Sequence, residues 1–156
     1  MPTLTINDES LDLSGALSVF HAASDELNQR YGGGGDQHLQ VDEMKPPLGL
    51  FLVARLDSHL AGGVGVRPIG NANKNLGEVK RLWVRPDLRQ RGYATALMKD
   101  IEQRARLLGY RRLYLETGSK QPEAIAFYAK TGWESIDEFP PGVFTHPTSH
   151  RFTKFL

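Results

Sequence analysis

Short apolar runs and alternating apolar and polar residues mark several segments of the chain as β-strands. Turn-forming residues separate them, as in the Asp-Ser-His sequence at 57–59 and the Asn-rich loop at 70–77. Gly62, Gly63 and Gly65 interrupt one run and predict a bulge or a close backbone approach there. The segments that we expect to be strands are residues 3–7, 48–56, 60–69, 78–84, 112–117, 133–136 and 150–156.

Three other segments carry apolar residues at helical spacing. The first helix is expected at 11–31, with a buried face formed by Leu13, Leu17, Phe20 and Leu27. The second, at 93–108, has the clearest helical period, and Gly109 ends it. Its buried face should consist of Ala94, Leu97, Met98, Ile101, Ala105 and Leu108. The third is expected at about 123–130, because Pro122 is well suited to a first helical turn.

The order of these segments predicts a mixed α/β fold. The strands at 48–56, 60–69 and 78–84 are expected to form an antiparallel meander. The strand at 78–84, the helix at 93–108 and the strand at 112–117 form a βαβ unit, which makes these two strands parallel with a right-handed crossover. The chain of 156 residues has no repeat, linker or low-complexity tract, so we expect residues 1–156 to be one domain.

Composition and charge exclude several classes of protein. The absence of cysteine excludes disulfides, thiolate metal sites and a cysteine nucleophile. A formal net charge of +1 without a basic stripe argues against a nucleic-acid partner. The N-terminal residues do not resemble a signal peptide, and the longest apolar run, at 48–54, is too short to span a membrane. A cytoplasmic protein that acts on a small molecule is therefore expected.

Metal binding is not expected. The five histidines show no paired spacing of the kind found in metal sites. His146 and His150, in or beside a C-terminal loop, are interpreted as structural or surface residues.

A candidate phosphate-binding loop lies at residues 89–94, between a strand and the second helix. The N-terminus of a helix exposes unpaired N–H groups and a partial positive charge. Gly92 and Ala94 let a ligand approach the backbone, while Arg89 and Arg91 add positive charge. The segment therefore indicates a pyrophosphate site. The alternative is a solvated basic turn that caps the helix.

Two common nucleotide-binding motifs are absent. The chain has no Gly-x-x-x-x-Gly-Lys-Ser/Thr sequence of a P-loop. Gly63-x-Gly65 lacks the third glycine of the dinucleotide fingerprint and opens no helix. The four glycines at 32–35 are interpreted as a surface loop.

The chain resembles the GNAT superfamily of N-acetyltransferases in two sequence blocks over roughly residues 48–137. The family's pyrophosphate loop, Arg/Gln-x-x-Gly-x-Gly/Ala, matches residues 89–94 and follows a Val-x-Pro sequence at 84–86. Its second block, Ala-Ile-x-Phe-Tyr-x-x-x-Gly-Phe, matches residues 124–133. Both blocks occur in the expected order and on the expected elements.

This resemblance implies a mostly antiparallel sheet, with one parallel pair splayed apart to hold acetyl-coenzyme A and helices on both faces. The pantetheine arm would pair with the backbone near Trp83 and Val84, and no metal would take part. An Asn that often contacts the cofactor is Gln121 here, a departure that puts this contact in doubt. The residues that would hold the cofactor are Trp83, Val84, Arg89, Gln90, Arg91, Gly92, Tyr93, Ala94, Thr95 and Gln121.

Acetyl transfer to an amine requires a base for the amine and an acid for the leaving thiolate. The resemblance implies that Tyr128 is the acid, although its ring could instead be a core residue. It also implies a carboxylate base, for which Glu78 is the first candidate; Glu116 and water are the alternatives. Without a cysteine nucleophile, direct transfer in a ternary complex is favoured.

The acceptor is expected to be a small-molecule amine bound by segments 30–47 and 138–149. Asp36, Asp42 and Glu43 could attract a cationic amine or could simply solvate the loop. A protein acceptor, a non-catalytic sensor of acyl-coenzyme A, and a monomer or homodimer all stay open.

Overall fold

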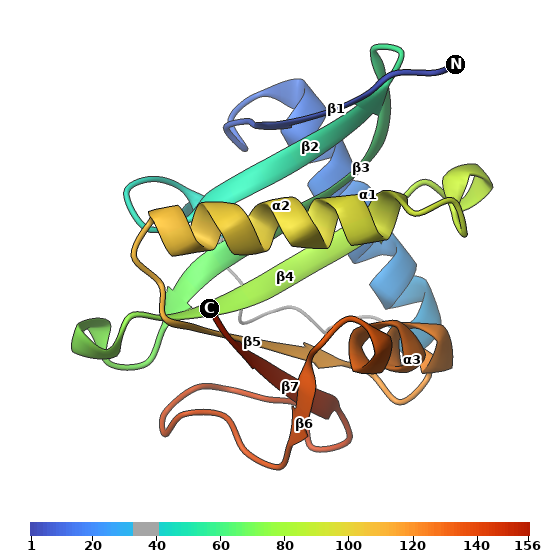
Figure 1. The fold of residues 1–156 in the computed structure, drawn as a ribbon. Coiled ribbons are helices and arrows are strands. Elements are labelled where there is room, and N and C mark those ends of the chain that lie inside the picture. Colours follow the sequence, from blue (N-terminus) through green and yellow to red (C-terminus); the bar gives the residue numbers. More distant parts are fainter. Residues whose placement is uncertain (33–40) are drawn as a thin grey trace.

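The structure, a computed structural model, describes residues 1–32 and 41–156. Within them, seven strands form one sheet in the order β1-β2-β3-β4-β5-β7-β6 (Figure 1). The strands are β1 (Leu4–Asp8), β2 (Leu50–Leu56), β3 (His59–Ile69), β4 (Leu76–Val84), β5 (Arg112–Thr117), β6 (Glu134–Ile136) and β7 (His150–Phe155). The helices are α1 (Ser14–Tyr31), α2 (Tyr93–Leu107) and α3 (Pro122–Lys130), with short 3₁₀ helices η1 (Val41–Met44), η2 (Ala72–Lys74) and η3 (Pro86–Leu88).

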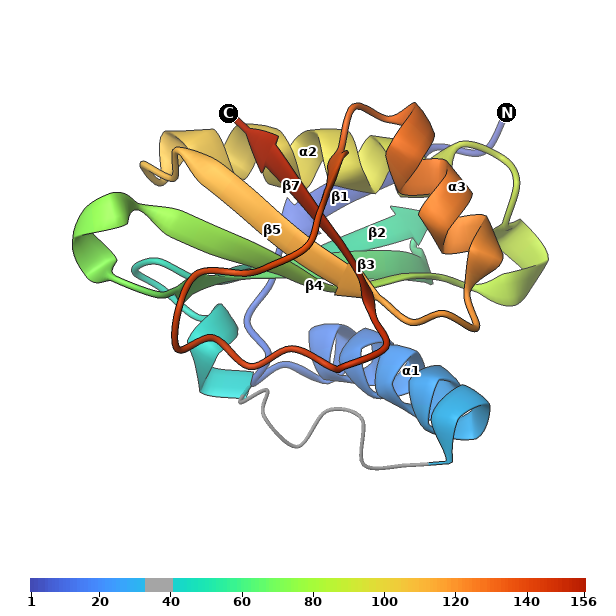
Figure 2. The same ribbon diagram turned by 90° about the horizontal axis from the view of Figure 1, so that it is seen from below.

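The expected mixed sheet with one parallel pair is confirmed, since β4 and β5 are parallel and the other neighbouring strands are antiparallel. Helix α1 covers one face of the sheet, and α2 and α3 lie on the other (Figure 2). Alternate side chains of β2 pack into the core on opposite faces of the sheet. Leu52 belongs to the core cluster under α2, while Phe51 and Val53 belong to the cluster under α1.

Helix α2 buries the face expected from its period, including Leu97, Met98, Ile101 and Ala105. Helix α1 begins later than expected. Leu13 is its N-cap and 55% exposed, so the prediction that Leu13 is buried is wrong. Leu11, before the helix, is buried instead.

A bulge interrupts the pairing of β3 with β4, as the glycines of β3 indicated. The register shifts between Gly63 and Gly65, and Arg81 on β4 has a φ of 62°. Because of the extra residue on β4, simple alternation fails there: Lys80 reaches Glu78 on its own side of the strand, and Arg81 contacts α1. Uninterrupted alternation along β4 would place Lys80 and Leu82 on one side of the strand, but only Leu82 packs against the core under α2.

The parallel ladder between β4 and β5 is short. It pairs only residues 76–78 with 112–114. Beyond Glu78, β4 continues to Val84 and β5 continues to Thr117 without pairing to each other. The two strands thus leave backbone groups facing an opening in the middle of the sheet.

No helix in the described ranges is both long and apolar enough to cross a membrane.

Candidate active site

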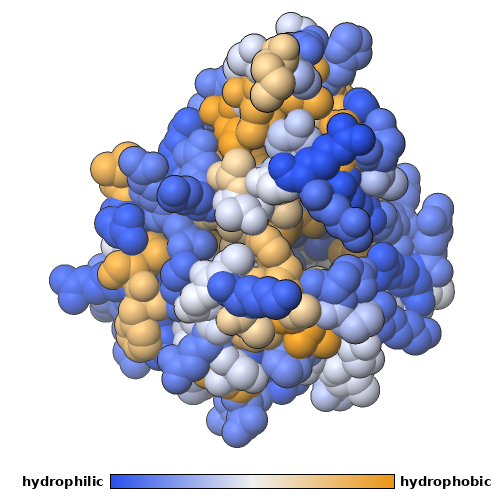
Figure 3. Space-filling view, turned by 45° about the vertical axis from the view of Figure 1, so that its right-hand side comes forward, coloured by the Kyte–Doolittle hydropathy of each residue, from blue (hydrophilic) through white to orange (hydrophobic). Residues whose placement is uncertain are grey.

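A cleft of about 770 Å³ occupies the opening between β4 and β5. Figure 3 shows the side of the molecule where α3 and the end of α1 meet, with apolar surface in a hollow rimmed by polar residues. The cleft walls come from α1, β4, the start of α2, the end of β5, α3 and the loop before β7. They include most residues expected to hold the cofactor: Trp83, Val84, Arg89, Gln90, Gly92, Tyr93, Ala94, Thr95 and Gln121.

The start of α2 presents unpaired amides at one end of this cleft. Gly92, the N-cap, has a φ of 88°, and Gln90 has a φ of 63°. The Ala96 N–H is the first to bond back, to the Gly92 carbonyl at 3.1 Å, and no side chain caps the helix. The N–H groups of residues 93–95 therefore have no partner within the helix and can bind an anion.

The two arginines of this loop differ in their positions. Arg89 donates from Nε to the Val84 carbonyl at 2.8 Å and from a terminal nitrogen to Glu26 at 2.6 Å. It therefore ties the loop to β4 and α1, a positioning role that the sequence did not indicate. Arg91 is exposed and lies outside the cleft wall, so it is available only to a ligand that reaches the rim.

Gln121, whose contact with the cofactor was in doubt, lines the cleft next to α1. Its side-chain amide donates to the Tyr31 hydroxyl at 3.4 Å, and the Lys120 N–H donates to the same oxygen at 3.1 Å. Arg30 adds an ion pair of 2.8 Å with Glu123 at the start of α3. The end of α1 is thus joined to the β5–α3 loop across the cleft.

Tyr128 of α3 contributes its hydroxyl to the cleft and its ring to the core. The side chain is 7% exposed, and its ring packs against Phe127, Trp133 and Phe152. Among the described residues the hydroxyl makes no hydrogen bond, although it belongs to a residue of the cleft wall. Burial raises the pKa of Tyr128, so the phenol keeps its proton at neutral pH. The ring is therefore a core residue that also lines the cleft, and its role as the acid stays a prediction.

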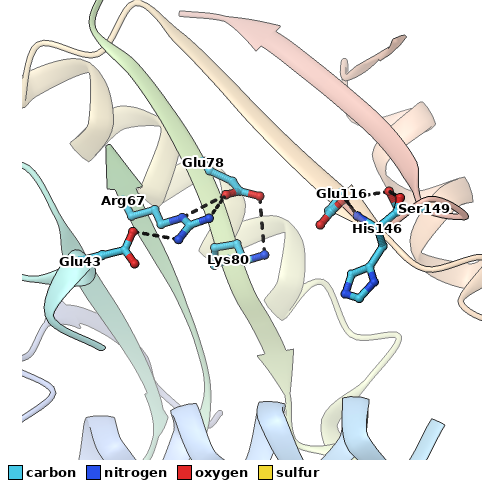
Figure 4. A network of polar contacts seen from close by, with 7 residues as sticks. All are labelled: Glu43, Arg67, Glu78, Lys80, Glu116, His146 and Ser149. Carbon is cyan, nitrogen blue, oxygen red and sulfur yellow. Dashed lines mark hydrogen bonds and ion pairs between the residues drawn. The ribbon is translucent and has the colours of Figure 1, made fainter. Parts of the chain in front are cut away.

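Glu78 is fully buried and is not a residue of the cleft wall. One carboxylate oxygen accepts two hydrogen bonds from Arg67, at 3.0 and 2.8 Å, and Arg67 also pairs with Glu43 (Figure 4). Its other oxygen accepts no hydrogen bond from the described residues and lies 3.6 Å from the Lys80 ammonium. An amine in the cleft would reach Glu78 only through water or past Lys80.

Glu116 of β5 lines the cleft directly. One of its carboxylate oxygens accepts hydrogen bonds from the Ser149 hydroxyl at 2.7 Å and from the His146 N–H at 3.2 Å (Figure 4). These bonds fix the carboxylate and hold the loop before β7 against the end of β5. Of the two acidic candidates, Glu116 is the one in contact with the cleft.

His146, Thr148 and Ser149 also line the cleft, and the sequence analysis missed them. The available signal was strand pairing. Because β7 is antiparallel to β5 and His150 pairs with Thr117, residues just before β7 must lie beside the cleft end of β5.

The acidic residues named as candidate acceptor ligands have other partners. Asp42 pairs with Lys45 at 3.1 Å and Glu43 with Arg67 at 2.8 Å, while Asp36 lies outside the described residues, as do Gly33 to Gly35. No group of three or more metal-ligating side chains occurs in residues 1–32 and 41–156.

Comparison with known proteins agrees with this architecture. An IAA acetyltransferase of Azospirillum brasilense is 32% identical over 141 residues, which cover 90% of this chain and 91% of that protein. The uncharacterized N-acetyltransferase YjgM of Escherichia coli is 32% identical over 87 residues, 56% of this chain. Those residues span about half of YjgM, 52% of its length.

Solved structures share the fold across the whole chain. The PaiA N-acetyltransferase of Thermoplasma acidophilum, solved with coenzyme A, has a TM-score of 0.73 at 17% identity and covers 99% of both chains. The model of the acetyltransferase (GNAT) family matches residues 17–133, which include the α2 loop and the Tyr128 helix. This chain belongs to the acetyltransferase (GNAT) family.

Proposed function

We propose that the protein transfers the acetyl group of acetyl-coenzyme A to an amine within a ternary complex. The observation that carries this proposal is the cleft between β4 and β5, with unpaired α2 amides at one end and the Tyr128 hydroxyl in its wall. The GNAT family match and the coenzyme A bound to the Thermoplasma neighbour support the choice of co-substrate.

The residues present fit coenzyme A chemically. The amides of residues 93–95 suit the pyrophosphate, and the unpaired edges of β4 and β5 can accept and donate hydrogen bonds to an extended amide-containing arm. Apolar side chains of the cleft, such as Leu82 and Leu115, suit its methylene groups. The co-substrate supplies a thioester, and the protein supplies orientation and proton transfer.

The transfer forms a bond between the amine nitrogen and the acetyl carbon and breaks the bond between that carbon and sulfur. One proton leaves the amine, and one is needed by the thiolate. Tyr128 donates a hydrogen bond or its proton to sulfur, for which its protonated state suits it. The phenol regains a proton from solvent when the products leave.

For the amine proton we propose Glu116 as the nearer acceptor, because it lines the cleft and Glu78 does not. Glu78, the first candidate from the sequence, would act through a water beside Lys80. Glu116→Gln keeps the hydrogen-bond acceptor for Ser149 while removing the base, so we expect turnover to fall roughly 10²- to 10⁴-fold, the usual contribution of acid–base catalysis.

Glu78→Gln is the matched comparison. It leaves the buried Arg67 without its full counter-charge, and breaking a buried pair typically costs ~3–5 kcal/mol of stability. Stopped assays over a pH series measure the loss of a base in each variant, and urea unfolding measures the loss of stability. A pH–rate profile changed by Glu78→Gln and unaffected by Glu116→Gln would transfer the base to Glu78.

The overall proposal is tested by titrating acetyl-coenzyme A calorimetrically and by following thiol release across a panel of amines. We expect binding, and thiol release that depends on the amine. If acetyl-coenzyme A binds but no amine in a broad panel is acetylated, the protein is an acyl-coenzyme A sensor. Absence of binding would refute both.

A further inference from the structure

Lys80 of β4 lies in the cleft wall, at the cleft side of the ion-pair network that also contains Glu78, Arg67 and Glu43. Its side chain is only 14% exposed, yet in the described parts of the chain its ammonium donates no hydrogen bond. The nearest carboxylate oxygen, on Glu78, is 3.6 Å away, and that carboxylate already accepts two bonds from Arg67. An ammonium in the cleft wall whose N–H groups donate to no described residue can donate them to an anionic group of a ligand.

The acidic residues of the cleft wall are, in contrast, already engaged. Glu26 pairs with Arg89 at 2.6 Å and Glu123 with Arg30 at 2.8 Å. Glu116 accepts two hydrogen bonds through one oxygen, which leaves its other oxygen for an amine. Among the described residues of the cleft wall, Glu116 is therefore the carboxylate with an oxygen left for an ammonium.

Lys80 and Glu116 stand on the two strands that border the opening, and Figure 4 shows both directed into the space between β4 and β5. Arg81, also in the wall, is instead engaged with α1, through a hydrogen bond to Ser24 and its position over the Phe20 ring. The arrangement sets a cationic group opposite an anionic one within a single small-molecule site. A molecule with an amine and a carboxylate close together has the complementary charges.

From this arrangement we infer that the acceptor is an anionic amine of the amino-acid type, whose carboxylate binds Lys80 while its amine faces Glu116. The inference rests on the proposed acetyl transfer and specifies its substrate class. It disfavours polyamines and aminoglycosides, which would bring several positive charges close to the Lys80 ammonium.

The test compares each acceptor with its carboxamide: glycine with glycinamide, methionine with methioninamide and phenylalanine with phenylalaninamide, with spermidine as the polycation. For each pair, kcat/KM is measured by thiol release in the wild type and in Lys80→Met. The quantity compared is the ratio of kcat/KM for the acid to kcat/KM for its amide. The acid and the amide differ in amine basicity, but this difference is the same for both enzymes and cancels when their ratios are compared.

We expect Lys80→Met to lower this ratio roughly 10- to 150-fold, the usual effect of one hydrogen bond to a charged group. Lys80→Arg, which keeps the charge, should retain most of the ratio. Lys74→Met, in the exposed η2 turn, is the matched control and should leave the ratio unchanged. Acetyl-coenzyme A affinity, measured by calorimetry, shows whether each variant keeps its folded cleft.

An acid-to-amide ratio that Lys80→Met leaves unchanged would overturn the inference. So would a wild type that acetylates spermidine or the amides but none of the acids, and in that case acetyl transfer itself would stand. Failure of the wild type to bind acetyl-coenzyme A would instead refute the proposed function, and the inference with it.

Discussion

Replacing Tyr128 with phenylalanine removes one hydroxyl and leaves the ring in place. The ring contacts with Phe127, Trp133 and Phe152, at centroid distances of 5.2, 6.1 and 5.7 Å, are retained. Within the described residues the hydroxyl has no hydrogen bond to lose. The free energy of unfolding should therefore change little, and so should the affinity for acetyl-coenzyme A.

The expected loss is in turnover. The pKa of an ordinary phenol is already above that of a thiol, and burial raises the pKa of Tyr128 further, so complete proton transfer to the leaving thiolate is unfavourable. The contribution is then a hydrogen bond to the developing thiolate, typically worth ~1.5–3 kcal/mol. At 1.36 kcal/mol for each factor of ten, kcat should fall roughly 10- to 150-fold, with the Michaelis constant for acetyl-coenzyme A nearly unchanged.

Tyr110 provides a matched control. It is also buried with a raised pKa, but it lies outside the cleft wall and its hydroxyl donates to the Leu48 carbonyl at 2.5 Å. Tyr110→Phe should cost ~1 kcal/mol of stability and leave kcat unchanged. Thiol-release kinetics measure kcat, and urea unfolding measures the free energy of unfolding, for both variants. Full turnover in Tyr128→Phe would show that the thiolate leaves without this residue.

Two further predictions concern the α2 loop and a surface ion pair. Gly92→Val forces a branched residue to a φ of 88° beside the unpaired amides and should weaken acetyl-coenzyme A binding at least tenfold in calorimetry. Gly109→Val is the control, at a φ of 100° at the far end of α2: it should cost similar stability without loss of affinity. The hydrogen bond from Arg55 holds the pKa of Glu9 below its usual 4.5, so the pair stabilises the fold above that pH and the effect is lost as the pH falls through the lowered pKa. Unfolding free energies of wild type and Glu9→Gln should therefore differ at pH 7 and converge as the pH falls below the lowered pKa of Glu9; a difference independent of pH would contradict this assignment.

Sequence periodicity predicted α2 and β5 well because both carry buried apolar residues at regular spacing. Helix α2 and strand β5 occur within one residue of the expected bounds. The start of α1 was misplaced because Leu11 is buried from the preceding loop, where helical spacing does not apply. The Arg81 bulge was visible only from the glycines of the partner strand.

The site was less predictable where it depends on neighbours distant in sequence. The loop before α2 is local in sequence, so the place of residues 89–95 at the start of that helix could be predicted directly. The environment of Glu78 depends on Arg67, its partner across β3 and β4, and therefore on a hairpin register that spacing alone does not determine. His146 and Ser149 reach the cleft through the pairing of β7 with β5, a contact between segments far apart in the chain.

The three-residue ladder between β4 and β5 makes the sheet two half-sheets with little direct connection. A ligand whose extended arm bonds to both open edges would act as an additional strand and complete the hydrogen-bonded network across the gap. Cofactor binding should then couple the β1–β4 half to the β5–β7 half mechanically, as well as stabilise the native state by mass action. Hydrogen exchange would report this coupling: on saturation with coenzyme A, the amide protons of residues 79–84 and 115–117 should show the largest decrease in exchange rate.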